Sequence, residues 1–173
     1  MQLGYLADHA EFTPTLSRWH HQEWAYLRPD ESLESRTKRL QSSCGHSEIP
    51  TVIIAFADDV LLGSAILIAH DMDTRPNLSP WLAGVFVRPE HRRRGIGSAL
   101  VQRAIGEATR LRVQRLYLYT PSAQSFYARR GWSLLERTKY LGADVTVMFL
   151  DLQPNQTLER TADRHEEQLR VER

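Results

Sequence analysis

The sequence predicts an α/β domain with a mixed central sheet of about seven strands and helices on both faces. Three observations support this class. Short apolar runs rich in β-branched and aromatic residues recur along residues 1–152, and segments with apolar residues at helical spacing lie between them. The chain has 173 residues, of which 42% are hydrophobic, so it can form one domain with a sizeable core.

The N-terminal part of the chain predicts one strand and two helices. Gln2 to Ala7 is short and partly alternating, which is typical of a strand. Thr13-Pro14 has the composition of a helix start, with proline at the first helical position, and this helix is expected to reach about Arg28. A second helix is expected to start between Asp30 and Ser32 and to end near Ser42.

Three strands follow in the middle of the chain. Val52–Phe56 and Leu61–Ala69 are apolar and β-branched, and Asp58-Asp59 between them predicts the turn of a hairpin. A loop from His70 to Ser79 then leads into the strand Trp81–Val87.

A helix that ends near Leu111 is expected after this strand. One stripe of the helix is apolar and is expected to pack on the sheet: Ile96, Leu100, Ala104, Ala108 and Leu111. Three polar residues are expected to stay in solvent: Gln102, Arg103 and Glu107.

The C-terminal part of the domain predicts three strands and one short helix. Gly131 is expected to cap the end of the helix. In chain order the elements are the strand Leu116–Tyr119, the helix Ser122–Arg130, and the strands Ser133–Tyr140 and Val145–Leu152, which flank Gly142-Ala143. Residues 153–173 are polar and charged and are expected to be a tail, either disordered or a loosely docked helix.

The segment between the strand Trp81–Val87 and the next helix carries the most specific pattern, which reads Arg88-Pro-Glu-His-Arg-Arg-Arg-Gly-Ile-Gly-Ser98. A strand that enters a glycine-bearing turn and then a helix directs unpaired backbone N–H groups and the positive end of a helix dipole to one place. A pyrophosphate is the natural ligand there. The P-loop pattern and the three-glycine dinucleotide pattern are both absent from this segment.

The run Arg92-Arg93-Arg94-Gly95-Ile96-Gly97 resembles motif A of the GNAT superfamily of acyl-CoA-dependent N-acyltransferases, whose pattern is Gln/Arg-x-x-Gly-x-Gly/Ala. The expected element order, β-α-α-β-β-β-α-β-α-β-β, is also that of the GNAT fold. The resemblance implies that acetyl-CoA is the cosubstrate and that no metal is needed. It assigns the pantetheine arm to the strand before the turn, at Val85, Phe86 and Val87. It assigns the pyrophosphate to the turn, at Arg92, Arg93, Arg94, Gly95, Ile96, Gly97 and Ser98. These contacts use backbone groups, so Gly95 and Gly97 are the sensitive positions, where a Cβ would obstruct close approach.

A second segment, Leu118–Trp132, is similar to motif B of the same family, which ends in Tyr-x-x-x-Gly-Phe/Tyr/Trp. The resemblance implies that Tyr127 acts as general acid toward the leaving thiolate. Reference pKa values of about 10 for tyrosine and 8.5 for a thiol make full proton transfer uphill by about 2 kcal/mol, so we expect a hydrogen-bond donor. Many members carry asparagine where this chain has Thr120, whose hydroxyl can also bond to the cofactor. The structural alternative for Tyr127 is a core tyrosine.

Glu23 is the candidate for handling the amine. On a helical wheel, Leu16, Trp19, Tyr26 and Leu27 define one face, and Glu23 lies within it. A carboxylate among apolar neighbours favours a cation, so Glu23 is expected to bind the substrate ammonium, directly or through a water that removes its proton. The alternative is a glutamate at the rim, or one paired with an internal arginine.

Three further residues are candidates for the acceptor site: Trp24, His70 and Asp71. For Trp24 the alternative is packing alone, and for the loop around His70 it is a solvated surface. A metal site is not expected in this loop, because adjacent residues on an extended segment point to opposite faces.

Composition excludes several classes. The 22 basic and 21 acidic residues give a net charge of +1, so no global field favours nucleic acid or an anionic membrane. The single cysteine, Cys44, cannot form an internal disulfide, and the N-terminus lacks the pattern of a signal peptide. The longest apolar run, Val60–Ala69, is about half of the ~20 residues that cross a bilayer. We therefore expect a cytoplasmic protein without a membrane role.

Together these patterns predict an N-acetyltransferase domain over residues 1–152, monomeric or homodimeric, that moves an acetyl group directly from acetyl-CoA to a primary amine of a small molecule or peptide N-terminus. Direct attack is expected because no cysteine lies near either motif. The first alternative is a non-catalytic acyl-CoA-binding or interaction module. The second is acetylation of a nucleic-acid-borne amine, which would need a basic face built from Arg110, Arg112, Arg115, Arg129 and Arg130.

Overall fold

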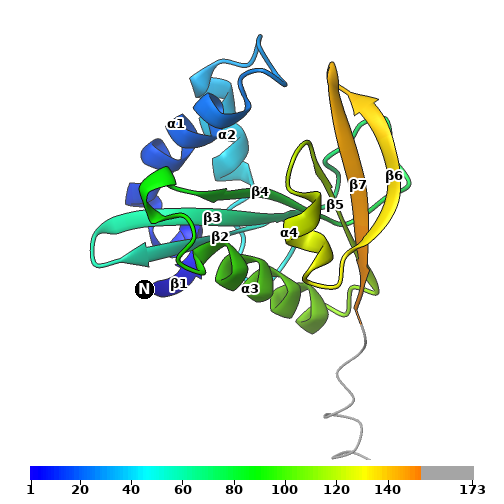
Figure 1. Ribbon diagram of the computed structural model, residues 1–173. Coiled ribbons are helices and arrows are strands. Elements are labelled where there is room, and N and C mark those ends of the chain that lie inside the picture. The colour runs from blue at the N-terminus through cyan, green and yellow to red at the C-terminus, as the bar shows by residue number, and fades with distance from the viewer. Residues whose placement is uncertain (153–173) are drawn as a thin grey trace, which may run out of the picture.

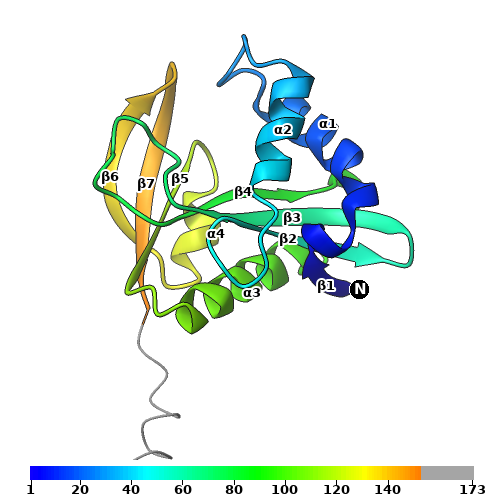
Figure 2. The same cartoon turned by 180° about the vertical axis from the view of Figure 1, so that it is seen from behind.

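The computed structural model describes residues 1–152, which form a seven-stranded sheet with helices on both faces (Figures 1 and 2). This architecture confirms the predicted fold class and element order. The strands and α-helices are β1 (Gln2–Tyr5), α1 (Thr13–Trp24), α2 (Leu33–Ser42), β2 (Thr51–Ala57), β3 (Val60–Ile68), β4 (Trp81–Val87), α3 (Ile96–Arg110), β5 (Arg115–Thr120), α4 (Gln124–Ala128), β6 (Ser133–Tyr140) and β7 (Ala143–Asp151). Three short 3₁₀ helices lie at Leu6–Asp8, Ala10–Phe12 and Pro89–His91.

The strands lie in the order β1-β2-β3-β4-β5-β7-β6. Neighbouring strands are antiparallel except for β4 and β5, which are parallel. These two strands pair only at Trp81 and Tyr117, close to the beginning of each. Beyond this pair the two strands diverge, so the sheet is open in its middle.

The helices α1 and α2 cover one face of the sheet and α3 covers the other (Figure 1). Residues 52–56 of β2 are all buried, as expected for a strand with helices on both sides. On one face, Leu16 of α1 and Leu40 of α2 pack with Ile54. On the other face, the predicted stripe of α3 packs on the sheet, and its fully buried members are Leu100, Ala104 and Ala108.

Helix α1 is shorter than predicted. It ends at Trp24 rather than near Arg28, and single turns follow, in which Leu27 N–H donates to the Trp24 carbonyl and Arg28 N–H donates to the Ala25 carbonyl. Pro29 disfavours helical geometry in Arg28, so the chain does not return to a regular helix before the proline. Ser32 is the N-cap of α2, where its hydroxyl accepts a hydrogen bond from Ser35 N–H at 3.1 Å.

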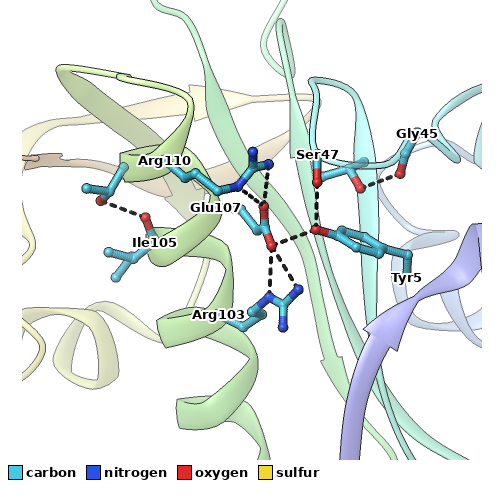
Figure 3. A network of polar contacts seen from close by, with 9 residues as sticks. Tyr5, Gly45, Ser47, Arg103, Ile105, Glu107 and Arg110 are labelled. Carbon is cyan, nitrogen blue, oxygen red and sulfur yellow. Dashed lines mark hydrogen bonds and ion pairs between the residues drawn. The ribbon is translucent and has the colours of Figure 1, made fainter. Parts of the chain in front are cut away.

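The prediction that Glu107 stays in solvent is wrong. Its side chain is buried and accepts a hydrogen bond from the Tyr5 hydroxyl at 2.7 Å (Figure 3). Arg103 and Arg110, on either side of Glu107 along α3, donate to the same carboxylate. Burial alone would raise the pKa of Glu107, but the bonds from Tyr5, Arg110 and Arg103 hold this pKa below its usual value. The network joins α3 to β1.

The predicted tail at residues 153–173 lies outside the described residues.

Candidate active site

Strand β4 carries a bulge at Gly84. Phe86 pairs with Ser64 and Ala83 pairs with Ile66, so β4 has one residue more than β3 between these pairs. Gly84 has a φ of +55°, and a Cβ at this position would lie 2.7 Å from Cδ1 of Ile66. Its backbone conformation therefore favours glycine, and a larger residue would also require the Ile66 side chain to move. A lone glycine in an apolar strand was the sequence signal for this bulge.

A buried polar chain holds the bulge in place. The Ser64 hydroxyl donates to the Gly84 carbonyl at 2.8 Å, so its oxygen accepts from Nε2 of His20, also at 2.8 Å. This arrangement assigns the ring proton of His20 to Nε2. Burial lowers the pKa of His20 to about 3, with smaller contributions from Arg36 and Arg39, so the ring is neutral. Sequence reasoning missed both His20 and Ser64.

The glycine turn leads directly into α3. Gly95 has a φ of +81° and is the N-cap, and the first helical hydrogen bond runs from Ala99 N–H to the Gly95 carbonyl. The N–H groups of Ile96, Gly97 and Ser98 precede this bond and have no intrahelical acceptor. They provide a group of backbone donors at the end of β4.

The two glycines of the turn differ in their structural requirements. Nothing lies within 4 Å of a Cβ at Gly95, so its positive φ, rather than close approach of another part of the protein, requires glycine there. A Cβ at Gly97 would lie 3.6 Å from Cγ2 of Val87, an ordinary contact. The protein itself therefore leaves room at Gly97.

The arginines of the turn lie on the surface, and one of them reaches back to β4. Nε of Arg92 donates to the Val87 carbonyl at 2.9 Å, and its guanidinium lies 5.8 Å from the ring centre of Phe86. Arg93 and Arg94 are exposed. The hydroxyl of Ser98 accepts a hydrogen bond from Arg130, which follows α4.

A cleft of about 360 Å³ opens beside the divergence of β4 and β5. It is lined by residues of α1 and α2, by the ends of β3 and β5, and by the middle of β4. Figure 2 shows the helices α1 and α2 on this side of the sheet. It brings together seven of the residues predicted for the site: Glu23, Trp24, His70, Asp71, Val85, Thr120 and Tyr127. The segment similar to motif B, Val85 of the strand before the glycine turn and the N-terminal candidates therefore meet at one place. Phe86, Val87 and the glycine turn Arg92–Ser98 do not line this cleft.

Residues 13–132 match the Acetyltransferase (GNAT) family. The chain belongs to this family. As a member of this family it is an N-acetyltransferase, and its cosubstrate is acetyl-CoA. A search of curated proteins gave no match.

Solved structures resemble the acetyltransferase in fold. An aminoglycoside 6′-N-acetyltransferase complexed with coenzyme A has a TM-score of 0.70 at 15% identity, over 90% of this chain and 99% of that one. An aminoglycoside 6′-acetyltransferase type Ii has a TM-score of 0.69 at 16% identity, with the same coverage. A ribosomal-protein-alanine N-acetyltransferase from Brucella melitensis has a TM-score of 0.68 at 18% identity, over 88% and 100%.

Tyr127 of the acetyltransferase is buried at the base of the cleft. Burial raises the pKa of its hydroxyl to about 12, although the charge of Arg130 opposes this shift. The ring makes edge contacts with Phe126 and Trp132, at centroid distances of 5.0 and 5.9 Å. Thr120 also lines the cleft, and its oxygen accepts from Ala123 N–H at 2.9 Å. The hydroxyl proton of Thr120 is therefore still available to a ligand.

Glu23 lines the cleft but not in the environment that the sequence predicted. Its side chain is 43% exposed, and its carboxylate lies 3.8 Å from Nη2 of Arg92. The predicted apolar surroundings are absent because α1 ends one residue later and Tyr26 is exposed. The alternative of a glutamate at the rim, beside an arginine, describes this geometry.

Asp71 lies deeper, after the end of β3. Burial raises the pKa of its carboxyl to about 6, while the charges of Arg28, Arg39 and Arg36 oppose the shift. His70 beside it is exposed at the cleft margin. The three arginines also line the cleft, and sequence reasoning missed them.

Two further findings concern other classes of site. Residues 1–152 contain no group of three or more His, Cys, Asp or Glu side chains placed to bind one metal ion. Among the same residues, no helix has the length and apolar character that a bilayer crossing requires.

Proposed function

We propose that the acetyltransferase moves the acetyl group directly from acetyl-CoA to a primary amine of a small molecule or peptide N-terminus. The cleft carries this proposal, because it joins the open edge of β4, the hydroxyl of Tyr127 and two carboxylates in one volume. An acyl donor and an amine can meet there without a covalent enzyme intermediate.

The residues around the divergence of β4 and β5 fit acetyl-CoA. The backbone of β4 pairs with β5 only at Trp81, so the edge beyond it can hydrogen-bond the pantetheine arm. The backbone donors that open α3 suit the pyrophosphate. The proposed cosubstrate site comprises Val85, Phe86, Val87, Arg92, Arg93, Arg94, Gly95, Ile96, Gly97, Ser98 and Thr120.

Tyr127 is proposed to donate a hydrogen bond to the sulfur of the thioester as it leaves. With a pKa of about 12, its hydroxyl remains protonated at neutral pH and is a weaker acid than an ordinary tyrosine. Hydrogen-bond donation is therefore favoured over early proton transfer, and the thiolate takes up a proton late or on release.

Glu23 and Asp71 are proposed to receive the substrate ammonium, with Trp24 and His70 forming the adjacent walls. An attacking amine must be neutral. At pH 7.4 deprotonation costs about 4 kcal/mol for a lysine amine and less than about 1 kcal/mol for an α-amine. Carboxylates at the cleft can accept this proton directly or through water.

Direct transfer is supported by the position of Cys44. The thiol donates to the Leu40 carbonyl at 3.3 Å, and Cys44 is not among the residues that line the cleft. Burial raises the pKa of the Cys44 thiol, which disfavours the nucleophilic thiolate. An acyl-cysteine intermediate is therefore not part of the proposal.

Calorimetry with coenzyme A tests the cosubstrate site. Gly97→Trp should weaken binding by at least tenfold, because a large side chain would occupy the space before the backbone donors. Gly106→Trp is the matched control, since Gly106 is exposed on the same helix with nothing within 4 Å of its Cβ. Equal affinity in folded Gly97→Trp would contradict this location. A thiol-release assay with a panel of amines then tests the transfer.

A further inference from the structure

Three arginines form one wall of the cleft. Arg28 lies in the loop after α1, and Arg36 and Arg39 lie three residues apart on α2, so they share one face of that helix. We call these three residues the arginine wall. The motifs that carry the cosubstrate proposal do not include them.

The arginine wall is only partly neutralised from within the protein. Glu31 contacts Nη2 of Arg36 at 2.5 Å and Nη2 of Arg39 at 2.7 Å, and Glu31 does not itself line the cleft. One carboxylate therefore serves two guanidiniums, each with five N–H donors. Arg28 has no carboxylate within ion-pair distance among residues 1–152.

Arg36 has the strongest need for a further acceptor. Its side chain is only 12% exposed, and Nε is buried without a hydrogen-bond partner in the described part of the chain. Burial, and next the charge of Arg39, lower the pKa of Arg36. A buried donor without a partner destabilises a protein unless a water or a ligand provides the acceptor, and an anionic ligand is the stronger acceptor for a guanidinium.

The other titratable groups of the cleft do not provide an acceptor for these arginines. Asp71 faces the arginine wall, but its oxygens form no ion pair with it within 4.0 Å. Glu23 is nearest to Arg92 of the glycine turn. His20 is neutral, and His70 is exposed at the margin. The cleft therefore has a cationic wall with spare donors and, separately, two carboxylates.

We propose that the acceptor amine carries a carboxylate or phosphate group that binds to Arg28, Arg36 and Arg39. This inference rests on the proposed transfer to an amine and names the class of that amine. Guanidinium groups suit both anions, because they donate two parallel hydrogen bonds. The ammonium of the same molecule lies toward Asp71 and Glu23. The acceptor is thus a small zwitterionic or acidic amine, and a polycation such as an aminoglycoside is disfavoured.

The test uses matched pairs of amines that differ in one anionic group: β-alanine against β-alaninamide, and O-phosphoethanolamine against ethanolamine. Kanamycin is the polycationic comparison. We expect kcat/KM for one anionic member to exceed that of its partner without the anionic group by at least tenfold. The pair that shows this preference distinguishes carboxylate from phosphate recognition. Equal values within both pairs, or a preference for kanamycin, would overturn the inference.

Arg28→Gln tests the arginine wall itself, because Arg28 has no ion pair within the described residues whose loss would destabilise the fold. This variant should reduce the preference for the anionic amine by about tenfold, with the KM for acetyl-CoA unchanged. Arg28→Lys should retain part of the preference. Arg18→Gln is the control, since Arg18 is exposed on α1 and, within residues 1–152, its one side-chain hydrogen bond is to the Thr15 hydroxyl. An unchanged preference in Arg28→Gln would overturn the inference.

Binding of the same amines to the coenzyme A complex, followed by protein NMR, separates this inference from the proposed function. Anion-dependent binding that is lost in Arg28→Gln without turnover would support the arginine wall and contradict amine acetylation. Turnover without any anion dependence would support acetylation and contradict the wall. If neither turnover nor anion-dependent binding is observed, both the proposed function and the arginine wall are contradicted.

Discussion

Tyr127 is the residue on which the proposed chemistry depends most. Its hydroxyl lies at the cleft, and its raised pKa keeps it protonated at neutral pH. We expect Tyr127→Phe to lower kcat by about 10- to 1000-fold, because the substitution removes the donor that stabilises the leaving thiolate. The affinity for acetyl-CoA should remain nearly unchanged. Steady-state kinetics with an accepted amine, together with calorimetry, measure both quantities.

Tyr117→Phe is a matched control for this experiment. Tyr117 is a partly buried tyrosine on β5 that packs against Trp81 and is not among the residues that line the cleft. Its kcat should stay close to that of the parent. If Tyr127→Phe retains full turnover, the tyrosine is a core residue, as the structural alternative holds.

Asp71 predicts a pH-dependent stability. Burial raises the pKa of this carboxyl from 3.8 to about 6, so the folded protein holds the proton more tightly than the unfolded chain does. The resulting stabilisation is complete below about pH 4 and is lost as the pH rises through about 6. Asp71→Asn cannot ionise, so it should leave the melting temperature unchanged at about pH 4. At about pH 8 a shift of about two pKa units corresponds to about 3 kcal/mol, so the variant should raise the melting temperature by about 6–12 °C.

Thermal unfolding of parent and variant across this pH range measures the difference. Asp73→Asn is the control, because Asp73 is exposed in the same loop. If the melting temperatures of the parent and of Asp71→Asn differ by the same amount at every pH, the pKa of Asp71 is not raised by folding.

At the scale of elements, the carboxylate of Glu107 holds α3 against β1. Three donors converge on it, from Tyr5, Arg103 and Arg110 (Figure 3). Glu107→Gln keeps the shape but removes the charge, and its amide group cannot accept all of these bonds. We expect a loss of about 1–3 kcal/mol in the free energy of unfolding. Activity should persist, since Glu107 lies outside the cleft lining.

Urea denaturation of Glu107→Gln checks this loss. Glu34→Gln serves as the comparison, because Glu34 is an exposed residue of α2 that pairs with Lys38 four residues on. An exposed pair of this kind contributes about 0.3–0.5 kcal/mol. Equal effects of the two substitutions would mean that the buried network is no stronger than a surface pair.

The elements could be predicted where their determinants are local. Thr13-Pro14 marks the start of α1, and Gly131 has the positive φ of a helix cap. The environment of Glu107 could not be predicted, because its partner Tyr5 is 102 residues away in the chain. Helical spacing places Glu107 on a polar face, and only the packing of β1 beside α3 buries it.

The candidate site likewise has parts that local sequence patterns reveal and parts that depend on the folded structure. The glycine turn and the segment around Tyr127 are contiguous patterns, so a single sequence reveals them. The arginine wall has no such pattern: Arg28, Arg36 and Arg39 come together because α1 ends early and α2 turns back across the sheet. Their meeting with Asp71 depends on how the helical layer sits on β3, and that is a property of the folded molecule.

At the scale of the whole molecule, the sheet is open in its middle, where one pair, Trp81 and Tyr117, joins β4 to β5. Such a sheet has an edge in its interior as well as at its rim. When acetyl-CoA lies along that edge as proposed, the amides of β4 that point toward β5 gain acceptors from the pantetheine arm. Hydrogen–deuterium exchange at residues 82–87 should therefore slow on addition of acetyl-CoA. Adenosine 3′,5′-bisphosphate lacks the arm and should not slow this exchange.

The open sheet also makes the stability of the protein against unfolding depend on the concentration of its cosubstrate. A ligand that binds only the folded state adds about 2.7 kcal/mol of stability when present at a hundred times its dissociation constant. If acetyl-CoA binds along β4 as proposed, the molecule that donates the acetyl group also stabilises the folded state. In a cell that runs short of acetyl-CoA, this acetyltransferase would lose turnover and resistance to unfolding together.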